Sequence, residues 1–416
     1  MSLLKSTIKN AIKFLFWMLA FLTPLLFVSN TKEVYEFPKV FFIYFLGSTV
    51  ILLFLIGLLF RFFKIKKPPL PIVLFLLVTT ISTLFSSHPY TSLWGYYSRF
   101  SGGLILLLVY FGLFVVLFSL FDRTFIFSLI TFSLIFTSIP ISLLGLSQFF
   151  GWSGTPIERV YSTFGQANWL ASYLSLVVLL AVHRFLKTGF TKKLLFWLGL
   201  FLLSFSCFWF TFSISGSLGL VTGLILLFLL NRKDYCLKRS FILVFLALFI
   251  AISFPGVFFL KIQDAFLDLP KFLTSLFSVY AQETSHKVAD PGFIRLGLWK
   301  STIKMIFSSP KAFLLGYGPE TFPYNFPFFR LPILNYSSEW SFILNKPHNY
   351  YLELIVETGI FSFIFYVWIL TKAFLKKHSW ITPMLGSFLV SNFFGWPAVT
   401  ISLYFWFFLA GVFKDE

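Results

Sequence analysis

Apolar segments long enough to cross a bilayer recur along most of the chain, separated by short polar runs. A membrane-spanning helix needs about 20 mostly apolar residues, and twelve segments approach that length. The predicted spans are residues 11–28, 38–60, 70–86, 102–121, 124–150, 166–186, 193–213, 215–231, 240–260, 349–373, 379–394 and 397–413. The pattern predicts an all-α, polytopic integral membrane protein with about 12 transmembrane helices.

One long stretch of polar and aromatic residues interrupts this series. The predicted organisation is N-terminal transmembrane helices in residues 1–260, a large loop in residues 261–347, and C-terminal transmembrane helices in residues 348–416. Polar groups are scarce in a membrane protein, and here they gather in this loop. We therefore expect function in the loop and at its exit.

Composition and charge give the chain an orientation. The chain is 58% hydrophobic and 12% charged, against about 25% charged in soluble proteins. If the N-terminus is cytoplasmic, 20 Lys and Arg residues lie in the cytoplasmic segments and 4 in the short outer loops. Such an excess marks the cytoplasmic side. Both termini are therefore predicted to be cytoplasmic and the large loop extracytoplasmic. The net charge of +18 is a topology signal, so membrane lipids and not nucleic acid are the expected partners.

The large loop contains several local signals. Asp290–Gly292 is typical of a helix start, and residues 293–308 have the pattern of an amphipathic helix with Arg295 and Trp299 on one side. A surface position on the membrane suits such a helix. A turn cluster, residues 316–320, and an aromatic strip, residues 322–332, which we do not expect to be regular helix, follow. Exposed aromatic residues suit a sugar-binding surface or the membrane interface, and both interpretations stay open. Arg330 and Glu339 are further candidate substrate contacts from this loop.

The loop ends at Lys346-Pro347-His348-Asn349, where an apolar helix begins. His348 is the one histidine at a loop-to-helix junction, which favours a functional role. Asn349, Glu353 and Glu357 recur every four residues and so share one helix face. A carboxylate roughly 12 Å into such a helix indicates either function or an ion pair near the interface.

Two arginines, Arg99 and Arg159, oppose the charge asymmetry because they lie in short outer loops. A guanidinium presents a planar set of donors that suits phosphate oxygens. The alternative is an interfacial arginine that extends to lipid headgroups.

Motifs for other chemistries are missing from the sequence. His, Cys and carboxylate residues do not occur at metal-ligand spacing, and Cys207 and Cys236 have no partner at disulfide or metal spacing. There is no Walker A sequence or Gly-rich nucleotide loop. We therefore expect no metal and no cofactor.

Three stretches resemble the O-antigen ligase and polymerase superfamily of bacterial membrane glycosyltransferases. One runs from Arg295-x3-Trp299 through Gly316-x-Gly318-x3-Phe322 to His348-Asn349-x9-Gly359-x2-Ser362, with Ser362 looser than the usual last residue. Another is Ser162–Asn168, similar to the family's start of a helix. The last is Trp94–Gly103, which contains Arg99.

The resemblance implies a GT-C-like membrane fold and a specific reaction. Such proteins take a glycan from an undecaprenyl-diphosphate carrier at the outer face of the bacterial cytoplasmic (inner) membrane and transfer it to an acceptor hydroxyl of a lipid, a glycan or a protein. By resemblance His348 is the catalytic histidine and Arg295 a diphosphate-binding arginine. Arg99, Arg159, Trp299, Arg330, Glu339, Asn349, Glu353 and Glu357 are the other expected site residues.

The turn at residues 211–217 departs from the family, because many members carry Ser-Arg there and this chain has no arginine. Either Arg99 or Arg159 replaces that charge, or the diphosphate is held differently. The resemblance does not separate a ligase from a repeat-unit polymerase or a protein O-oligosaccharyltransferase. The non-enzyme alternative is a lipid-linked glycan flippase, which would favour internal repeats and paired broken helices.

Overall fold

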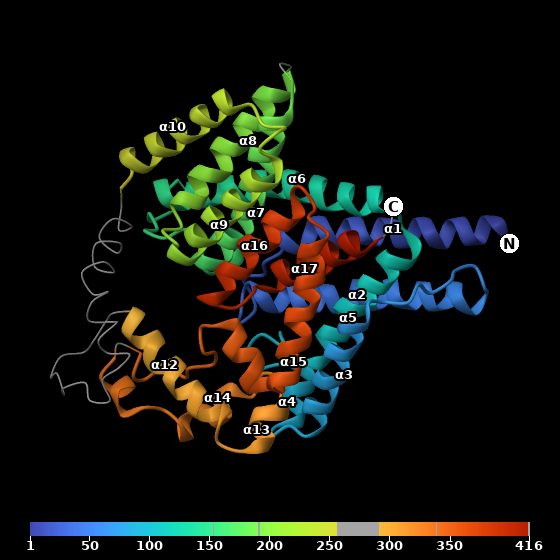
Figure 1. The fold of residues 1–416 in the computed structure, drawn as a ribbon, viewed down its shortest axis with the longest axis vertical. Coiled ribbons are helices and arrows are strands. Elements are labelled where there is room, and N and C mark those ends of the chain that lie inside the picture. Colours follow the sequence, from blue (N-terminus) through green and yellow to red (C-terminus); the bar gives the residue numbers. More distant parts are fainter. Residues whose placement is uncertain (153, 190–191, 256–290, 338, 415–416) are drawn as a thin grey trace.

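The computed structural model describes residues 1–152, 154–189, 192–255, 291–337 and 339–414, and these residues form helices joined by turns and loops, with no strand (Figure 1). The boundary predicted at residue 260 and the first part of the predicted loop, residues 261–290, lie outside the described residues. The longer helices are α1 (Ser2–Leu25), α2 (Glu36–Leu59), α3 (Leu70–Leu84), α5 (Leu104–Leu120), α6 (Arg123–Phe150), α7 (Ala167–Lys187), α8 (Lys192–Trp209), α9 (Ile214–Asn231), α10 (Leu237–Ser253), α12 (Pro291–Ile306), α15 (Tyr350–Leu375), α16 (Ile381–Phe393) and α17 (Val399–Phe413). Each of the twelve predicted spans overlaps one of these helices. Most ends are shifted by a few residues, but α1 begins at Ser2 and not at residue 11, and α10 ends at Ser253 and not at residue 260.

Seven helices in the described part of the chain are long and apolar enough to cross a membrane: α1, α2, α6, α7, α8, α9 and α15. Four more apolar helices, α3, α5, α16 and α17, are shorter. The protein is thus an all-helical, polytopic membrane protein, and the number of twelve spans stays a prediction. The predicted spans 193–213 and 215–231 are two separate helices, because α8 ends at Trp209 and α9 begins at Ile214 with Ser213 as its N-cap.

Helix α7 lies at the centre of the bundle, and almost its whole length is buried. Its neighbours include α8, α9 and α16. Large apolar side chains are instead exposed on other helices, such as α9 and α10, and these are the surfaces that suit contact with lipid. Because α7 is enclosed, the polar residues at its start, near Asn168, are held in a fixed place inside the protein.

A kink in α15 creates a docking place for the glycine turn of the loop. Gly359 has φ 82° inside the helix, a value that favours glycine. The interruption frees the carbonyls of Val356 and Glu357, which accept backbone hydrogen bonds from Tyr317 and Gly318 at 3.0 and 2.8 Å. The glycine turn, residues 316–320, is thereby held against the helix that follows His348.

The described part of the loop forms its own small core. Helix α12 is followed by α13 (Pro310–Leu315), α14 (Phe322–Asn325) and 3-10 turns up to Tyr336. Buried side chains of this core include Ile294, Leu298, Met305, Phe322 and Leu334. The expectation of no regular helix in residues 322–332 was wrong for one turn, α14, where Pro323 occupies a first-turn position that suits proline.

The helix expected at residues 293–308 is confirmed as α12, but the rest of the protein covers much of the side of α12 that carries Arg295 and Trp299. Thr302 and Ile306 are buried, while Arg295 and Trp299 are partly exposed. The position of α12 relative to a membrane stays a prediction.

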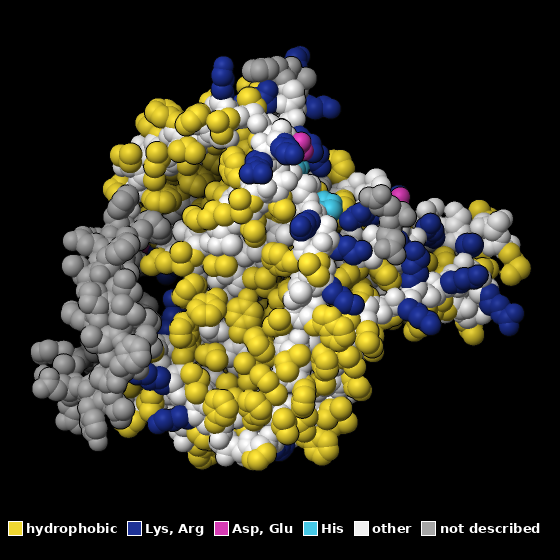
Figure 2. Space-filling view, in the orientation of Figure 1, with side chains coloured by type: hydrophobic (Ala, Val, Ile, Leu, Met, Phe, Trp, Pro, Cys, Tyr) yellow, Lys and Arg dark blue, Asp and Glu magenta, His cyan; other side chains and the backbone are white. Residues whose placement is uncertain are grey.

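Basic side chains collect away from the loop on the face drawn in Figure 2. Most of the visible Lys and Arg residues lie at the top and right of this face, over the ends of α1 and α8, and hydrophobic side chains cover the surface between them and the loop elements. This separation accords with the charge asymmetry of the sequence, and the direction of insertion stays a prediction.

Candidate functional site

His348 occupies a strained backbone position immediately before α15. Its φ of 55° lies in the left-handed region, which non-glycine residues adopt at a cost of about 1–3 kcal/mol when bulky neighbours constrain them. Asn349 then caps the helix, because its side-chain oxygen accepts hydrogen bonds from the backbone N–H groups of Tyr351 and Leu352 at 3.0 and 3.1 Å. The cap fixes where the helix starts and so fixes the direction of the imidazole.

The imidazole of His348 borders a small polar pocket. The pocket is lined by Gln166, Asn168, Ser215, Asn392 and Trp396, among others. The ring of Trp396 packs edge to face on His348, with 5.0 Å between ring centroids. Within the described part of the chain, neither ring nitrogen of His348 has a hydrogen-bond partner, so both can form a hydrogen bond with a substrate.

Helix α12 places two of the expected residues beside His348. Trp299 donates from Nε1 to the carbonyl of Pro347 at 3.1 Å, and Arg295 is close enough for its charge to act on the imidazole. Burial and, secondly, the charge of Arg295 lower the pKa of His348 to about 4. At neutral pH the imidazole is therefore uncharged, the form that can accept a proton.

Arg159 lies at the turn between α8 and α9. Its Nε donates to the carbonyl of Thr211 at 3.1 Å, and Nη2 donates to Oδ1 of Asn168 at 3.2 Å. The hydroxyl of Ser213 donates to the same Asn168 oxygen at 2.8 Å. Asn168 also lines the pocket that contains His348, so Arg159 is one side chain away from that pocket.

Arg99 faces a second, larger cavity. Its guanidinium lies over the ring of Trp169 at 5.1 Å, and Trp169 packs against Trp396 with ring centroids 5.9 Å apart. Trp396 borders both cavities. Three aromatic contacts therefore connect Arg99 with His348, and no hydrogen bond or ion pair of this guanidinium occurs within the described residues.

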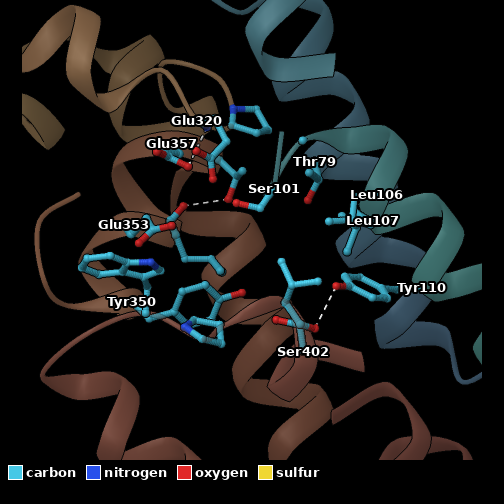
Figure 3. Close-up of a pocket in the computed structure, with 18 of the residues that line it drawn as sticks. Thr79, Ser101, Leu106, Leu107, Tyr110, Glu320, Tyr350, Glu353, Glu357 and Ser402 are labelled. Carbon is cyan, nitrogen blue, oxygen red and sulfur yellow. Dashed lines mark hydrogen bonds between the residues drawn. The ribbon is translucent and has the colours of Figure 1, made fainter. Parts of the chain in front are cut away.

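The larger cavity has a volume of about 160 Å³ and is lined by residues of α3, α5, α15 and α17 and by the loops that contain Arg99, Glu320 and Lys346 (Figure 3). At one end, opposite Tyr110 and Ser402, the carboxyl groups of Glu320, Glu353 and Glu357 lie together. Lys346 is buried among them, with Nζ 2.6 Å from Oε1 of both Glu320 and Glu353. The predicted helix face of Glu353 and Glu357 is thus real, and its partner is an ammonium.

Electrostatics keep that ammonium charged. Burial acts to lower the pKa of Lys346, but the three carboxylates outweigh it and raise that pKa well above its usual value. The carboxylate oxygens are close enough together to hold a metal ion. The Lys346 ammonium already bonds two of these carboxylates, so the geometry fits an ammonium-centred cluster.

Two expected loop residues have different surroundings. Arg330 donates from Nη2 to the carbonyls of Leu334 and Trp340 at 3.3 and 3.0 Å, so it holds the loop together. Glu339 is near Arg295, and burial raises the pKa of Glu339 while Arg295 acts in the opposite direction.

Sequence reasoning missed Lys346, Glu320, Trp169 and Trp396 as site residues. Lys346 and Glu320 stood in the quoted motifs, and one signal was present: only 15 acidic residues occur in the chain, and three fall in or beside these motifs. Trp396 had no such signal, because it lies between two short apolar helices.

Residues 199–367 match a family model described as O-antigen ligase. The matched region contains Arg295, Lys346, His348, Glu353 and Glu357, whereas Arg99 and Arg159 precede it. A comparison with curated proteins gave no match. Members of this family are glycosyltransferase-like enzymes of the O-antigen ligase or polymerase type, which act on lipid-linked glycans in a membrane. The match supports a relationship of this part of the polytopic membrane protein to the O-antigen ligase superfamily.

Proposed function

We propose that the protein transfers a glycan from a polyisoprenyl-diphosphate carrier, of the undecaprenyl type, to an acceptor hydroxyl at the outer face of the cytoplasmic membrane. The observation that carries the proposal is an uncharged, partly exposed His348 beside Arg295, inside a region that matches the O-antigen ligase family. A neutral imidazole and a nearby cation are the two groups that this reaction needs.

His348 acts as the general base in this proposal. The acceptor O–H gives its proton to the imidazole while the oxygen attacks the anomeric carbon of the glycan. The bond between that carbon and the diphosphate oxygen breaks, and its electron pair stays on the lipid diphosphate. General base catalysis contributes about 10² to 10⁴ in rate.

Cationic groups stabilise the charge that builds on the leaving diphosphate. Arg295 acts on His348 through its charge, Arg99 lies over Trp169, and Arg159 donates to Asn168, which lines the pocket of His348. Arg159 also donates to Thr211, in the turn where many relatives carry their own arginine. We therefore assign the missing family charge to Arg159 and a separate contact to Arg99.

The test is transfer in proteoliposomes with a labelled undecaprenyl-diphosphate glycan and a crude acceptor fraction. Wild-type protein should form a new glycosidic bond and release the lipid diphosphate, and His348→Ala should lose about 10² to 10⁴ of the rate while it still binds the donor. Movement of the donor across the bilayer without bond formation would instead support a flippase.

The type of product separates the enzyme classes. Transfer to a lipid core indicates a ligase, lengthening of the lipid-linked chain indicates a polymerase, and a labelled polypeptide indicates a protein O-oligosaccharyltransferase.

A further inference from the structure

Within the described residues, two buried carboxylate oxygens beside Lys346 accept no hydrogen bond. Lys346 bonds Oε1 of Glu353 at 2.6 Å and lies 3.8 Å from Oε1 of Glu357. Oε2 of Glu353 and Oε1 of Glu357 are left buried without a hydrogen bond. A buried polar atom without a hydrogen bond is costly, so these oxygens indicate that a donor from a ligand completes the cluster.

The cavity next to these oxygens has walls that suit a sugar ring. Glu353, Glu357 and Tyr350 line it (Figure 3), and so do the aromatic residues Tyr96 and Trp396. A pyranose presents C–H faces that pack on aromatic rings and hydroxyl groups that donate to carboxylates. Ligand pockets commonly combine such apolar walls with a few polar groups that fix orientation.

Charge restricts which groups of a sugar fit at this end of the cavity. One ammonium faces three carboxyl groups there, so a phosphate or carboxylate group of a ligand is disfavoured beside Glu353 and Glu357, whereas Arg99 lines another part of the same cavity. A hydroxyl or an amino group would be attracted to the carboxyl groups. We propose that this end of the cavity binds a pyranose through hydrogen bonds from its hydroxyl or amino groups to Glu353 and Glu357. The inference rests on the proposed glycan transfer and extends it to the chemical class of the sugar.

Glu353→Gln is the decisive variant because it reverses one hydrogen bond. The Lys346 ammonium can only donate, so the amide oxygen of Gln must remain on Lys346. The amide N–H₂ group then takes the position of Oε2, and an acceptor becomes a donor. The side-chain volume is nearly unchanged, so the cavity keeps its shape. Asp234→Asn, at the exposed ion pair with Lys187, makes the same chemical change away from the cavity and serves as the control.

Binding is measured by saturation-transfer NMR on full-length protein in nanodiscs. The probes are the methyl glycosides of glucose, galactose, mannose and N-acetylglucosamine. At least one neutral glycoside should bind wild type and Asp234→Asn and bind Glu353→Gln about 10-fold more weakly, as expected for loss of a hydrogen bond to a charged group.

A second variant guards against misfolding. Leu107→Trp fills the cavity from its α5 wall and leaves the Lys346 cluster intact, so it should also abolish binding while thermal unfolding stays near wild type. Equal binding in wild type and both cavity variants, or no binding of any neutral glycoside to wild type, would overturn the proposal.

Transfer kinetics then identify the source of the sugar. A raised KM for the acceptor alone in Glu353→Gln assigns the cavity to the acceptor sugar, and a raised KM for the lipid-linked donor alone assigns it to the donor sugar. Absence of transfer in the wild type would contradict the proposed function, whereas the binding results would still decide whether the cavity takes a sugar.

Discussion

At the scale of single residues, His348 differs from an ordinary histidine in its proton affinity. Burial and Arg295 lower its pKa to about 4, against about 6.5 for an unperturbed imidazole. A base must be unprotonated to act, and the lowered pKa extends the range of the unprotonated form toward acid. The value of kcat/KM reports the ionisation of the free enzyme.

The first prediction is a pH profile without a limb near pH 6.5. The kcat/KM of wild type should stay constant from neutral pH down to about 5 and then fall as pH decreases through the lowered pKa of His348, about 4. Arg295→Gln removes one of the two causes, so its acid limb should move to higher pH. A wild-type limb near 6.5 that Arg295→Gln does not shift would contradict this environment for His348.

Arg159 offers a test by relocation. Arg159→Ala removes the hydrogen bonds to Thr211, in the α8–α9 turn, and to Asn168, in α7, and should lower kcat by about 10²-fold, typical for loss of one donor to a developing anion. Ile214 follows Ser213 and is partly exposed, so Ile214→Arg rebuilds the Ser-Arg order of many relatives. Transfer should recover in part in the double variant. The assignment of the charge to Arg159 is wrong if Arg159→Ala retains full activity, or if the double variant Arg159→Ala/Ile214→Arg recovers no transfer.

At the scale of elements, the kink of α15 explains the spacing of the sequence motif. Ten residues lie between His348 and Gly359. This length places the cap at Asn349, the carboxylates at Glu353 and Glu357, and the kink one after another along the helix. A side chain at Gly359 would overlap the backbone of Leu314, in α13. The same glycine therefore allows both the kink and the contact with the loop.

Gly359→Ala should consequently destabilise the protein and lower activity. Left-handed backbone costs about 1–3 kcal/mol for a residue that is not glycine, and the overlap with α13 adds to this. Gly199→Ala is the matched control, because Gly199 lies in α8 with open space where a side chain would be added, and alanine is the better helix former. Thermal unfolding in nanodiscs should show a clear loss of Tm for Gly359→Ala and none for Gly199→Ala. Equal Tm values would mean that the α13 contact does not constrain this position.

These elements also show what the sequence could predict. Apolar length predicted where the helices lie, and Asn349, Glu353 and Glu357 were correctly placed on one face. The partner of that face, Lys346, could not be found in this way because its contact with Glu320 depends on how the glycine turn docks in the kink. Trp396 and Trp169 meet through the packing of α16 and α17 against α7, a tertiary contact that hydrophobic periodicity does not encode.

At the scale of the whole molecule, charge and chemistry lie on different sides. His348, Arg295 and the Lys346 cluster belong to the loop and its exit, while clusters of Lys and Arg occupy the other ends of the helices (Figure 2). The proposed donor and acceptor meet outside the cytoplasm only if the loop is extracytoplasmic. The orientation of the chain therefore decides whether the site can perform the proposed reaction.

Cysteine labelling tests this orientation directly. Lys311 is exposed on α13, beside the glycine turn, and Lys233 is exposed between α9 and α10. In a Cys236→Ser background, which keeps only the buried Cys207, an impermeant thiol reagent added to intact cells should label Lys311→Cys and should label Lys233→Cys only after permeabilisation. We expect this result because 20 Lys and Arg residues lie in the predicted cytoplasmic segments and only 4 in the short outer loops, and positively charged segments stay in the cytoplasm. The reverse labelling would place His348 on the cytoplasmic side, and the proposed transfer at the outer face would then be impossible even if every contact within the site is correct.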